Sequence, residues 1–192
     1  MILNIDKILK AVDRPISDPW DHYIVDDILN YEFLNEDNFT TDDNLYYQLT
    51  GELMVHKEKI LSTYNPIRLT EEVEGQLLDK PIENTWPRVQ WLTQPAYADK
   101  EIHMDVVNKI WTCVVYCYPI KSNGTILIEG TPDNIINSKE VEWKQNRGVI
   151  FSPGTKNYPT WHKIINQTNK IRRAIAINIL SSNNKLKLPS QL

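Results

Sequence analysis

The sequence is poor in several features that mark whole classes of protein. It has two cysteines, Cys113 and Cys117, and six glycines in 192 residues, and no apolar run approaches the roughly 20 residues of a membrane-spanning helix. On one strand the two cysteines would lie about 13 Å apart, whereas a disulfide needs Cα atoms within about 7 Å. We therefore expect reduced thiols. Together with an amino terminus that lacks a signal-peptide profile, this predicts a cytoplasmic protein with no membrane partner.

A basic excess is also missing. Lysine and arginine total 21 against 25 aspartate and glutamate residues, for a net charge of −4. Proteins that bind a phosphate backbone usually carry a positive excess, so the balance argues against a nucleic-acid partner. A hydrophobic content of 41% is typical of a globular protein. A chain of this length favours a single domain over 1–192.

The first part of the chain, 1–85, has mainly helical periodicity and is interpreted as helical support. The expected elements are a helix over 4–12, a short strand in HYIVDDIL (22–29) leading into a helix from about Asn30 to Asp37, a long amphipathic helix over 44–64 capped by Asp42 or Asp43, and a shorter helix over 70–80 capped by Thr70.

Strand patterns replace helical ones after residue 85. Short segments rich in β-branched and aromatic residues are separated by turn signals such as KSNG, TPDN and SPGT. The expected strands are RVQWL, EIHMD, WTCVVYCY, TILIEG, EVEWK, GVIFS, TWHKII and RRAIAINIL. About eight strands at regular spacing predict a sandwich or jelly roll over 86–182, followed by a tail over 183–192.

The last strand alternates between two kinds of face. Ile175, Ile177 and Ile179 share one face with Arg173 and need a hydrophobic cover, which the amino-terminal helices can supply. The opposite face carries small residues behind Arg172. Small side chains in the interior of a barrel leave room for a ligand.

A His-x-Asp pair lies in the segment EIHMD, where His103 and Asp105 are two residues apart. On a strand, residues i and i+2 point to the same side, so both can bind one ion while Met104 faces away. Two imidazoles and one carboxylate form the facial set that holds non-haem Fe(II) with open positions, and Zn²⁺ can occupy the same set. Two polar surface residues at a strand end are the alternative interpretation.

A second histidine is needed for this site, and His162 is placed like one. It lies in the strand segment TWHKII beside Trp161. Taken alone, His162 also fits a hydrogen-bonded core histidine. His22 and His56 lie in polar surroundings in the helical part, and we expect both at the surface.

Arg172 strengthens the interpretation of these residues as a ligand site. It follows His162 by ten residues across the turn NQTNK, so antiparallel strands would return it toward the candidate ligands. An inward arginine among alanines is costly unless an anion meets it, and a guanidinium suits a carboxylate. The alternative is a strand-end arginine whose head reaches solvent, which we expect for Arg173.

In this order and spacing, the motifs resemble the double-stranded β-helix of the 2-oxoglutarate- and Fe(II)-dependent oxygenases. The matching segments are HMD (103–105), KIWTCVVY (109–116), NGTILI (123–128), EVEWKQNRGVIFSP (140–153), TWH (160–162) and RRAIAI (172–177). The chain is most similar to the prolyl-4-hydroxylase-like branch, with its short bacterial and phage members. The resemblance covers the strand-rich part well and the helical part loosely. A single Gly124 stands where many relatives have a Gly-Gly pair.

The resemblance implies a mixed α/β (α+β) fold with a double-stranded β-helix (jelly roll) core and N-terminal helices packed on one face. It also implies that His103, Asp105 and His162 ligate Fe(II). Arg172 would hold the distal carboxylate of 2-oxoglutarate, assisted by Tyr116. A register shift of one residue would give that role to Arg173.

The implied activity is a dioxygenase that uses Fe(II), 2-oxoglutarate and O₂ to hydroxylate an unactivated C–H bond, releasing succinate and CO₂. The substrate would be a peptidyl side chain, as in prolyl hydroxylases, or a small molecule, gripped by the segments 88–100 and 129–139. The competing hypothesis is a non-catalytic jelly-roll binding or structural module, for example in a phage particle, with a vestigial or zinc-occupied site. Such relics usually lose a ligand or the arginine, and here all four residues are present.

Overall fold

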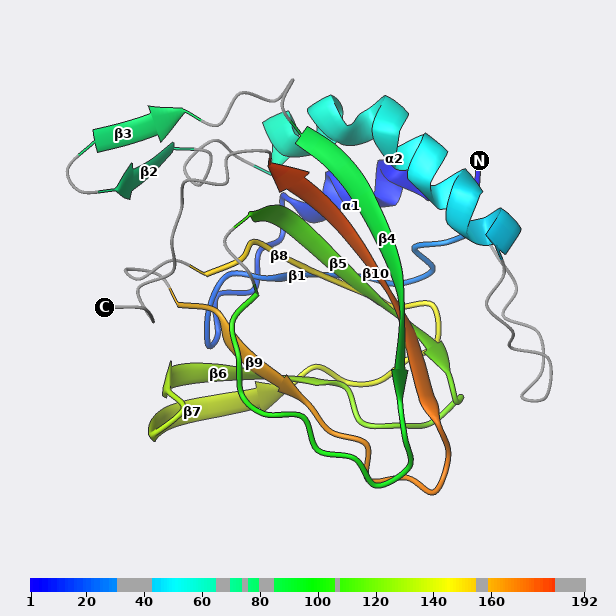
Figure 1. Cartoon of the computed structure of the whole chain (residues 1–192), viewed down its shortest axis with the longest axis vertical. Helices are drawn as coiled ribbons and strands as arrows, with labels where there is room; N and C mark the ends of the chain where they lie inside the picture. Colours follow the sequence, from blue (N-terminus) through cyan, green and yellow to red (C-terminus); the bar gives the residue numbers. More distant parts are fainter. Residues whose placement is uncertain are drawn as a thin grey trace.

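The computed structural model describes residues 1–30, 43–64, 70–73, 76–79, 85–105, 108–154 and 159–181. Antiparallel strands dominate these ranges, and two helices precede most of them in the chain (Figure 1). The described strands form one sheet of five, one of three and a separate hairpin of two.

The five-stranded sheet is the centre of the molecule. Its strands, in spatial order, are β1 (Tyr23–Val25), β8 (Gly148–Phe151), β5 (Lys109–Tyr118), β10 (Arg172–Ser181) and β4 (Thr85–Gln94). All neighbouring pairs are antiparallel. Nearly every residue of β5 and β10 is buried. Both faces of these strands are covered, which explains why β5 reads as a continuous apolar run rather than an alternating one.

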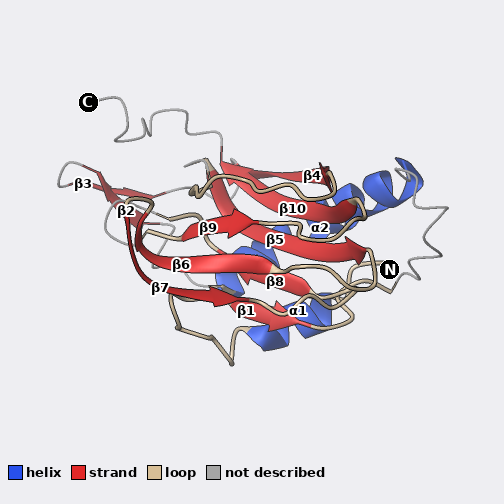
Figure 2. Ribbon diagram, turned by 90° about the horizontal axis from the view of Figure 1, so that it is seen from below, coloured by secondary structure: helices blue, strands red, loops and turns tan. Residues whose placement is uncertain are grey.

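The three-stranded sheet covers one of these faces. Its order is β7 (Asn134–Glu140), β6 (Thr125–Thr131) and β9 (Trp161–Ile164). Figure 2 shows it in front of the five-stranded sheet, with both helices on the far side. The result is a layer of helices, a large sheet and a small sheet. The two facing sheets have the form of a β-sandwich, in agreement with the jelly-roll class expected from the sequence.

The helices pack where the isoleucine face of the last strand predicted a cover. In α2 (Asp43–Thr63), Leu45, Leu49 and Leu53 recur every four residues and are buried. They share one hydrophobic core with Ile175 and Ile177 of β10. The expectation of helices on one face is therefore confirmed.

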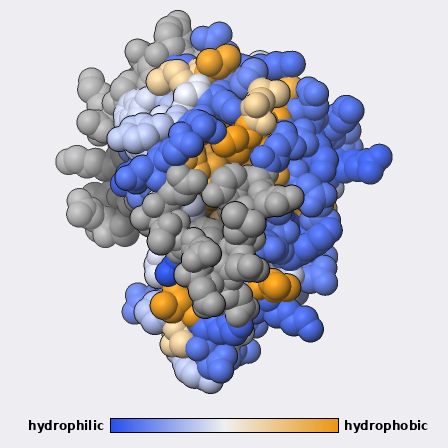
Figure 3. Space-filling model, turned by 90° about the vertical axis from the view of Figure 1, so that its right-hand side faces the viewer, coloured by the Kyte–Doolittle hydropathy of each residue, from blue (hydrophilic) through white to orange (hydrophobic). Residues whose placement is uncertain are grey.

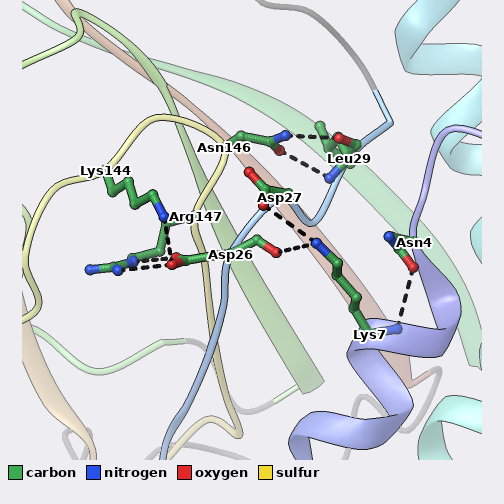
Figure 4. Close-up of polar contacts among 8 residues, drawn as sticks. All are labelled: Asn4, Lys7, Asp26, Asp27, Leu29, Lys144, Asn146 and Arg147. Carbon is green, nitrogen blue, oxygen red and sulfur yellow. Dashed lines mark hydrogen bonds and ion pairs between the residues drawn. The ribbon is translucent and has the colours of Figure 1, made fainter.

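The short helix α1 (Ile5–Ala11) is held at both its start and its side. The Asn4 side chain accepts a hydrogen bond from the Lys7 amide (3.3 Å) and caps the helix. Lys7 Nζ in turn donates to the backbone carbonyl of Asp26 (3.1 Å). These bonds tie α1 to the segment that follows β1 (Figure 4).

Ion pairs join the segment that follows β1 to the residues just before β8. The Asp26 carboxylate accepts hydrogen bonds from Arg147 Nε (2.7 Å) and Nη2 (3.2 Å) and from Lys144 Nζ (2.8 Å). Hydrogen bonds from Arg147 lower the pKa of Asp26 to about 2. Nearby, the Asn146 amide bonds both backbone groups of Leu29 (Figure 4). These contacts hold the carboxyl-terminal end of the edge strand β1 against the sheet.

Gly124, the single glycine where relatives have a pair, lies at a close backbone contact. A Cβ at this position would stand 1.6 Å from the carbonyl oxygen of Val141. The Gly124 amide also donates to Glu140 Oε1 (2.7 Å). Only a residue without a side chain fits this contact, which explains the glycine at position 124.

Three expectations about secondary structure are wrong. The helix expected over 70–80 is a hairpin of β2 (Thr70–Val73) and β3 (Gln76–Asp79). Glycine at position 75 opposes a helix there, and β-branched residues favour strands. The segment EVEWK is not a strand, because β7 ends at Glu140. The stretch 129–139, expected as a substrate loop, is mostly the β6–β7 hairpin. The helix expected at 30–37 falls outside the described residues.

The expected positions of the cysteines are confirmed, but that of one histidine is not. Cys113 and Cys117 are free and buried. His22, expected at the surface, is buried beneath Trp20, whose carbonyl bonds to its Nδ1 (2.8 Å). His56 is half-buried. The sequence neighbours of His22 are polar, so the sequence did not indicate that packing against Trp20 would bury its ring.

One side of the molecule is mostly hydrophilic, with hydrophobic atoms in small separate areas (Figure 3). No helix in the described part of the chain has the length and apolar character needed to cross a membrane.

Candidate metal centre

Two of the three candidate ligands come from backbone segments that hydrogen-bond to each other. His162 lies in β9, and His103 forms an isolated bridge with it. Each histidine amide donates to the other's carbonyl, at 3.0 Å from His103 and 2.9 Å from His162. Residues opposed in this way direct their side chains to the same side, and the imidazole centroids lie 4.5 Å apart. The strand expected over 101–105 is a single bridge, which is enough to bring the two rings together.

The Asp105 carboxylate completes the cluster. One ligand atom from each of the three residues lies within 4.8 Å of the others. Asp105 Oδ1 accepts a hydrogen bond from Lys109 Nζ (2.7 Å), and Oδ2 accepts one from the Thr112 hydroxyl (3.1 Å). Both partners belong to β5 and were not expected from the sequence.

The hydrogen bonds of the imidazoles leave one nitrogen of each ring available. Nδ1 of His103 contacts the Glu101 carbonyl (2.9 Å), and Nδ1 of His162 contacts the Thr160 carbonyl (3.0 Å). A carbonyl only accepts, so these contacts assign the proton to Nδ1. In the neutral form of each ring, Nε2 then carries a lone pair, which is the state a metal ligand requires.

Burial tunes the charges of the cluster. His162 is 5% exposed, and burial lowers its pKa to about 4, so the ring is neutral at pH 7. For Asp105, burial alone would raise the pKa. The charges of Lys109 and His162 and the hydrogen bonds from Lys109 and Thr112 outweigh burial and lower that pKa. The cluster therefore offers two imidazoles, that of His162 neutral, and one carboxylate, which is the set associated with non-haem Fe(II).

Arg172, the first residue of β10, is buried, at 1% exposure. Its Nε donates to the carbonyl of Asn123 (3.2 Å), while its Nη2 is buried with no hydrogen-bond partner among the described residues. Burial lowers the pKa of Arg172 to about 10. Arg173, by contrast, is half-buried on the other face. An unpaired buried guanidinium nitrogen is costly and is the place where an anion would be stabilised.

Two aromatic rings complete the surroundings of Arg172. The guanidinium carbon lies 4.7 Å from the Trp143 ring centroid and 5.5 Å from that of Tyr116. The two rings stack on each other at 4.5 Å. The Tyr116 hydroxyl donates to Thr125 Oγ1 (3.0 Å) and accepts from the Thr125 amide (2.8 Å). No sequence pattern around Trp143 indicated that it would contact Arg172.

The cluster and Arg172 border the same hydrophobic core between the two sheets. Tyr116, Trp143 and Phe151 belong to that core. Arg172 contacts the first two, and the Phe151 ring lies 5.1 Å from that of His162. The interior between the sheets thus contains a possible metal site and a possible anion site.

Comparisons with known proteins support the fold. The sequence matches no protein-family model and no curated protein. A Pseudomonas putida prolyl-4-hydroxylase structure is similar with a TM-score of 0.55 and 9% identity, covering 91% of this chain and 94% of that one. A Phytophthora capsici prolyl 4-hydroxylase structure gives 0.52 and 14%, covering 96% of this chain and 66% of that one. This chain shares its fold with prolyl 4-hydroxylases.

The likeness concerns architecture, because the identities are low. Both matched proteins are hydroxylases by name, and the chain spans only about two thirds of the Phytophthora protein (66%). The likeness agrees with the family resemblance found in the motifs. What this chain does depends on its own residues, namely the His103, Asp105 and His162 cluster and Arg172.

Proposed function

We propose that this chain is an Fe(II)- and 2-oxoglutarate-dependent oxygenase that hydroxylates an unactivated C–H bond of a peptidyl side chain or a small molecule. The observation that carries the proposal is the pairing of a His-Asp-His cluster with a buried arginine whose Nη2 is unpaired. The fold shared with two prolyl 4-hydroxylases supports it.

The donor atoms fit Fe(II). Nδ1 of each imidazole contacts a backbone carbonyl, which leaves Nε2 for the ion, and Asp105 supplies the single negative charge. Zn²⁺ would accept the same three ligands. Arg172 favours the oxygenase over a zinc protein. A buried cation that could bind the carboxylate of 2-oxoglutarate has no role in a zinc site.

Each residue then has a role in binding. His103, Asp105 and His162 would hold the ion on one side and leave positions open on the other. Arg172 Nη2 would bind the distal carboxylate of 2-oxoglutarate. The Tyr116 hydroxyl would join it by turning its proton away from Thr125. The aromatic core between the sheets would exclude water from the reacting groups.

Bound Fe(II) would supply O₂ activation, so that substrate, O₂ and 2-oxoglutarate yield the hydroxylated product, succinate and CO₂. The contribution of the protein is to position these reactants.

The test is an anaerobic titration of the Fe(II)-loaded protein with 2-oxoglutarate, followed by the visible metal-to-ligand charge-transfer band. We expect a saturable band that is lost in His162→Ala and in Asp105→Ala, while circular dichroism shows that both variants keep the fold. Full activity in either variant would show that the ligand set is wrong.

The same experiment separates the competing hypotheses. A folded, Fe(II)-loaded protein that gives no band does not take the cosubstrate, and a binding module or a zinc protein then becomes the better interpretation. Metal analysis of the purified protein distinguishes those two, because only the second retains stoichiometric zinc.

A further inference from the structure

Lys109 lies inside the candidate metal centre. Its Nζ is 2.7 Å from Asp105 Oδ1, and the two side chains are only 15% and 11% exposed. Lys109 is the first residue of β5 and pairs across the sheet with Leu180 of β10. The sheet therefore fixes the backbone of Lys109. The ion pair is largely buried and is not a surface contact.

The charges around Asp105 balance without a metal. The Asp105 carboxylate carries one negative charge, and the Lys109 ammonium carries one positive charge. A divalent ion bound by the same three ligands would add two positive charges close to the ammonium. The ion and Lys109 would then share the only carboxylate of the cluster, in surroundings that screen charge poorly.

The geometry adds a competition for the same oxygen atom. The ligand atoms lie up to 4.8 Å apart, whereas atoms that share one ion at bonds of about 2.1 Å in a facial arrangement are about 3 Å apart. At least one of the three ligand side chains must therefore move when an ion binds. In Asp105, Oδ1 is held by Lys109, and Oδ2 is held by the Thr112 hydroxyl.

We propose that Lys109 is a built-in competitor of the metal ion. Its ammonium is the counter-ion of Asp105 in the metal-free protein, and the ion must take that carboxylate from it. Lys109 therefore stabilises the metal-free fold and weakens metal binding. The inference rests on the proposed function in one respect, that the His-Asp-His cluster is a metal site.

A consequence concerns 2-oxoglutarate, which carries two negative charges. With Lys109 present, the loaded centre has excess positive charge, and a dianion relieves it. Metal and 2-oxoglutarate should thus strengthen each other's binding, and by the same factor in each direction. A neutral residue at position 109 should reduce this coupling.

The test measures Co(II) binding to the metal-free protein by its visible absorption, without 2-oxoglutarate. Lys109→Gln removes the charge and keeps an N–H donor, whereas Lys109→Arg keeps the charge. We expect Lys109→Gln to bind Co(II) about tenfold more tightly than the wild type and Lys109→Arg to bind within about threefold of it. Lys109→Gln should also unfold at a lower temperature without metal.

Lys163→Gln is the matched control. Lys163 follows His162 in β9, is half-buried and pairs with the exposed Asp99 (3.2 Å), in a contact that does not involve the cluster. Its substitution should leave the Co(II) affinity unchanged. If Lys109 only supported the structure, its loss would weaken Co(II) binding, so tighter binding is the result that such a role does not produce.

The outcomes separate the inference from the proposed function. A wild-type protein that does not bind Co(II) refutes the metal site itself. Wild-type binding together with equal or weaker binding by Lys109→Gln refutes only the competition. If Lys109→Gln does not fold, NMR of the Lys109 ammonium in the unchanged chain replaces it. Its protected signal should be lost when Zn²⁺ is added, and a signal that persists overturns the inference.

Discussion

Replacing Arg172 by methionine should weaken the binding of 2-oxoglutarate without lowering the stability of the metal-free protein. Within the described part of the chain the buried guanidinium donates to the carbonyl of Asn123, and burial lowers its pKa to about 10. Relative to the ordinary value of about 12.5, this lowering means that keeping the charge costs the folded state about 3 kcal/mol. The hydrogen bond and the contact with Trp143 offset about 2 kcal/mol of that cost. Arg172→Met should therefore leave the free energy of unfolding of the metal-free protein unchanged or raise it by about 1 kcal/mol.

Binding of 2-oxoglutarate should respond in the opposite direction. Removing the buried cation that would meet the distal carboxylate of 2-oxoglutarate should cost about 3 kcal/mol, or about a hundredfold in Kd. The charge-transfer titration measures this loss, and Co(II) binding should change far less.

Arg173→Met is the control for this experiment, because Arg173 lies on the other face of β10. If Arg173→Met loses 2-oxoglutarate and Arg172→Met does not, the assignment of the anchor is wrong. If Arg172→Met destabilises the metal-free protein by more than about 3 kcal/mol, the arginine is a structural residue, and burying its charge does not cost the folded state free energy.

Two further predictions concern the aromatic contact and the charge clamp. Trp143→Leu removes the ring that contacts the Arg172 guanidinium and should weaken 2-oxoglutarate binding about fivefold, with Trp143→Phe restoring most of it in the same titration; equal affinities in all three proteins would contradict a positioning role. Asp26 has a pKa of about 2 in the fold, below its unfolded value, so its contribution to stability is complete above about pH 4 and is lost as the pH falls toward 2. Urea unfolding should show Asp26→Asn less stable than the wild type at pH 6, with the difference shrinking between pH 4 and pH 2; a difference that does not depend on pH would show that the Arg147 and Lys144 contacts do not act through the carboxylate charge.

Much of the architecture followed from local patterns in the chain. The alternation of isoleucine and alanine in β10 predicted that one face would meet the helices and that Arg172 would point into the interior. Both are seen in the structure, because the side chains of a strand alternate strictly. The spacing of His103 and Asp105 and the choice of His162 over the other histidines also came from sequence. The structure places these three side chains together, while their role in binding metal stays a prediction.

The sequence by itself therefore determined the class of fold, the inward face of the last strand and the members of the candidate cluster, since each depends on residue type and short spacing. Only the tertiary structure decided that EIHMD forms a single bridge, that 70–79 is a hairpin and that His22 is buried. It also decided that Lys109 holds Asp105 and that Trp143 contacts Arg172. These contacts join side chains whose meeting depends on how separate segments pack, and no periodicity in the chain records that packing.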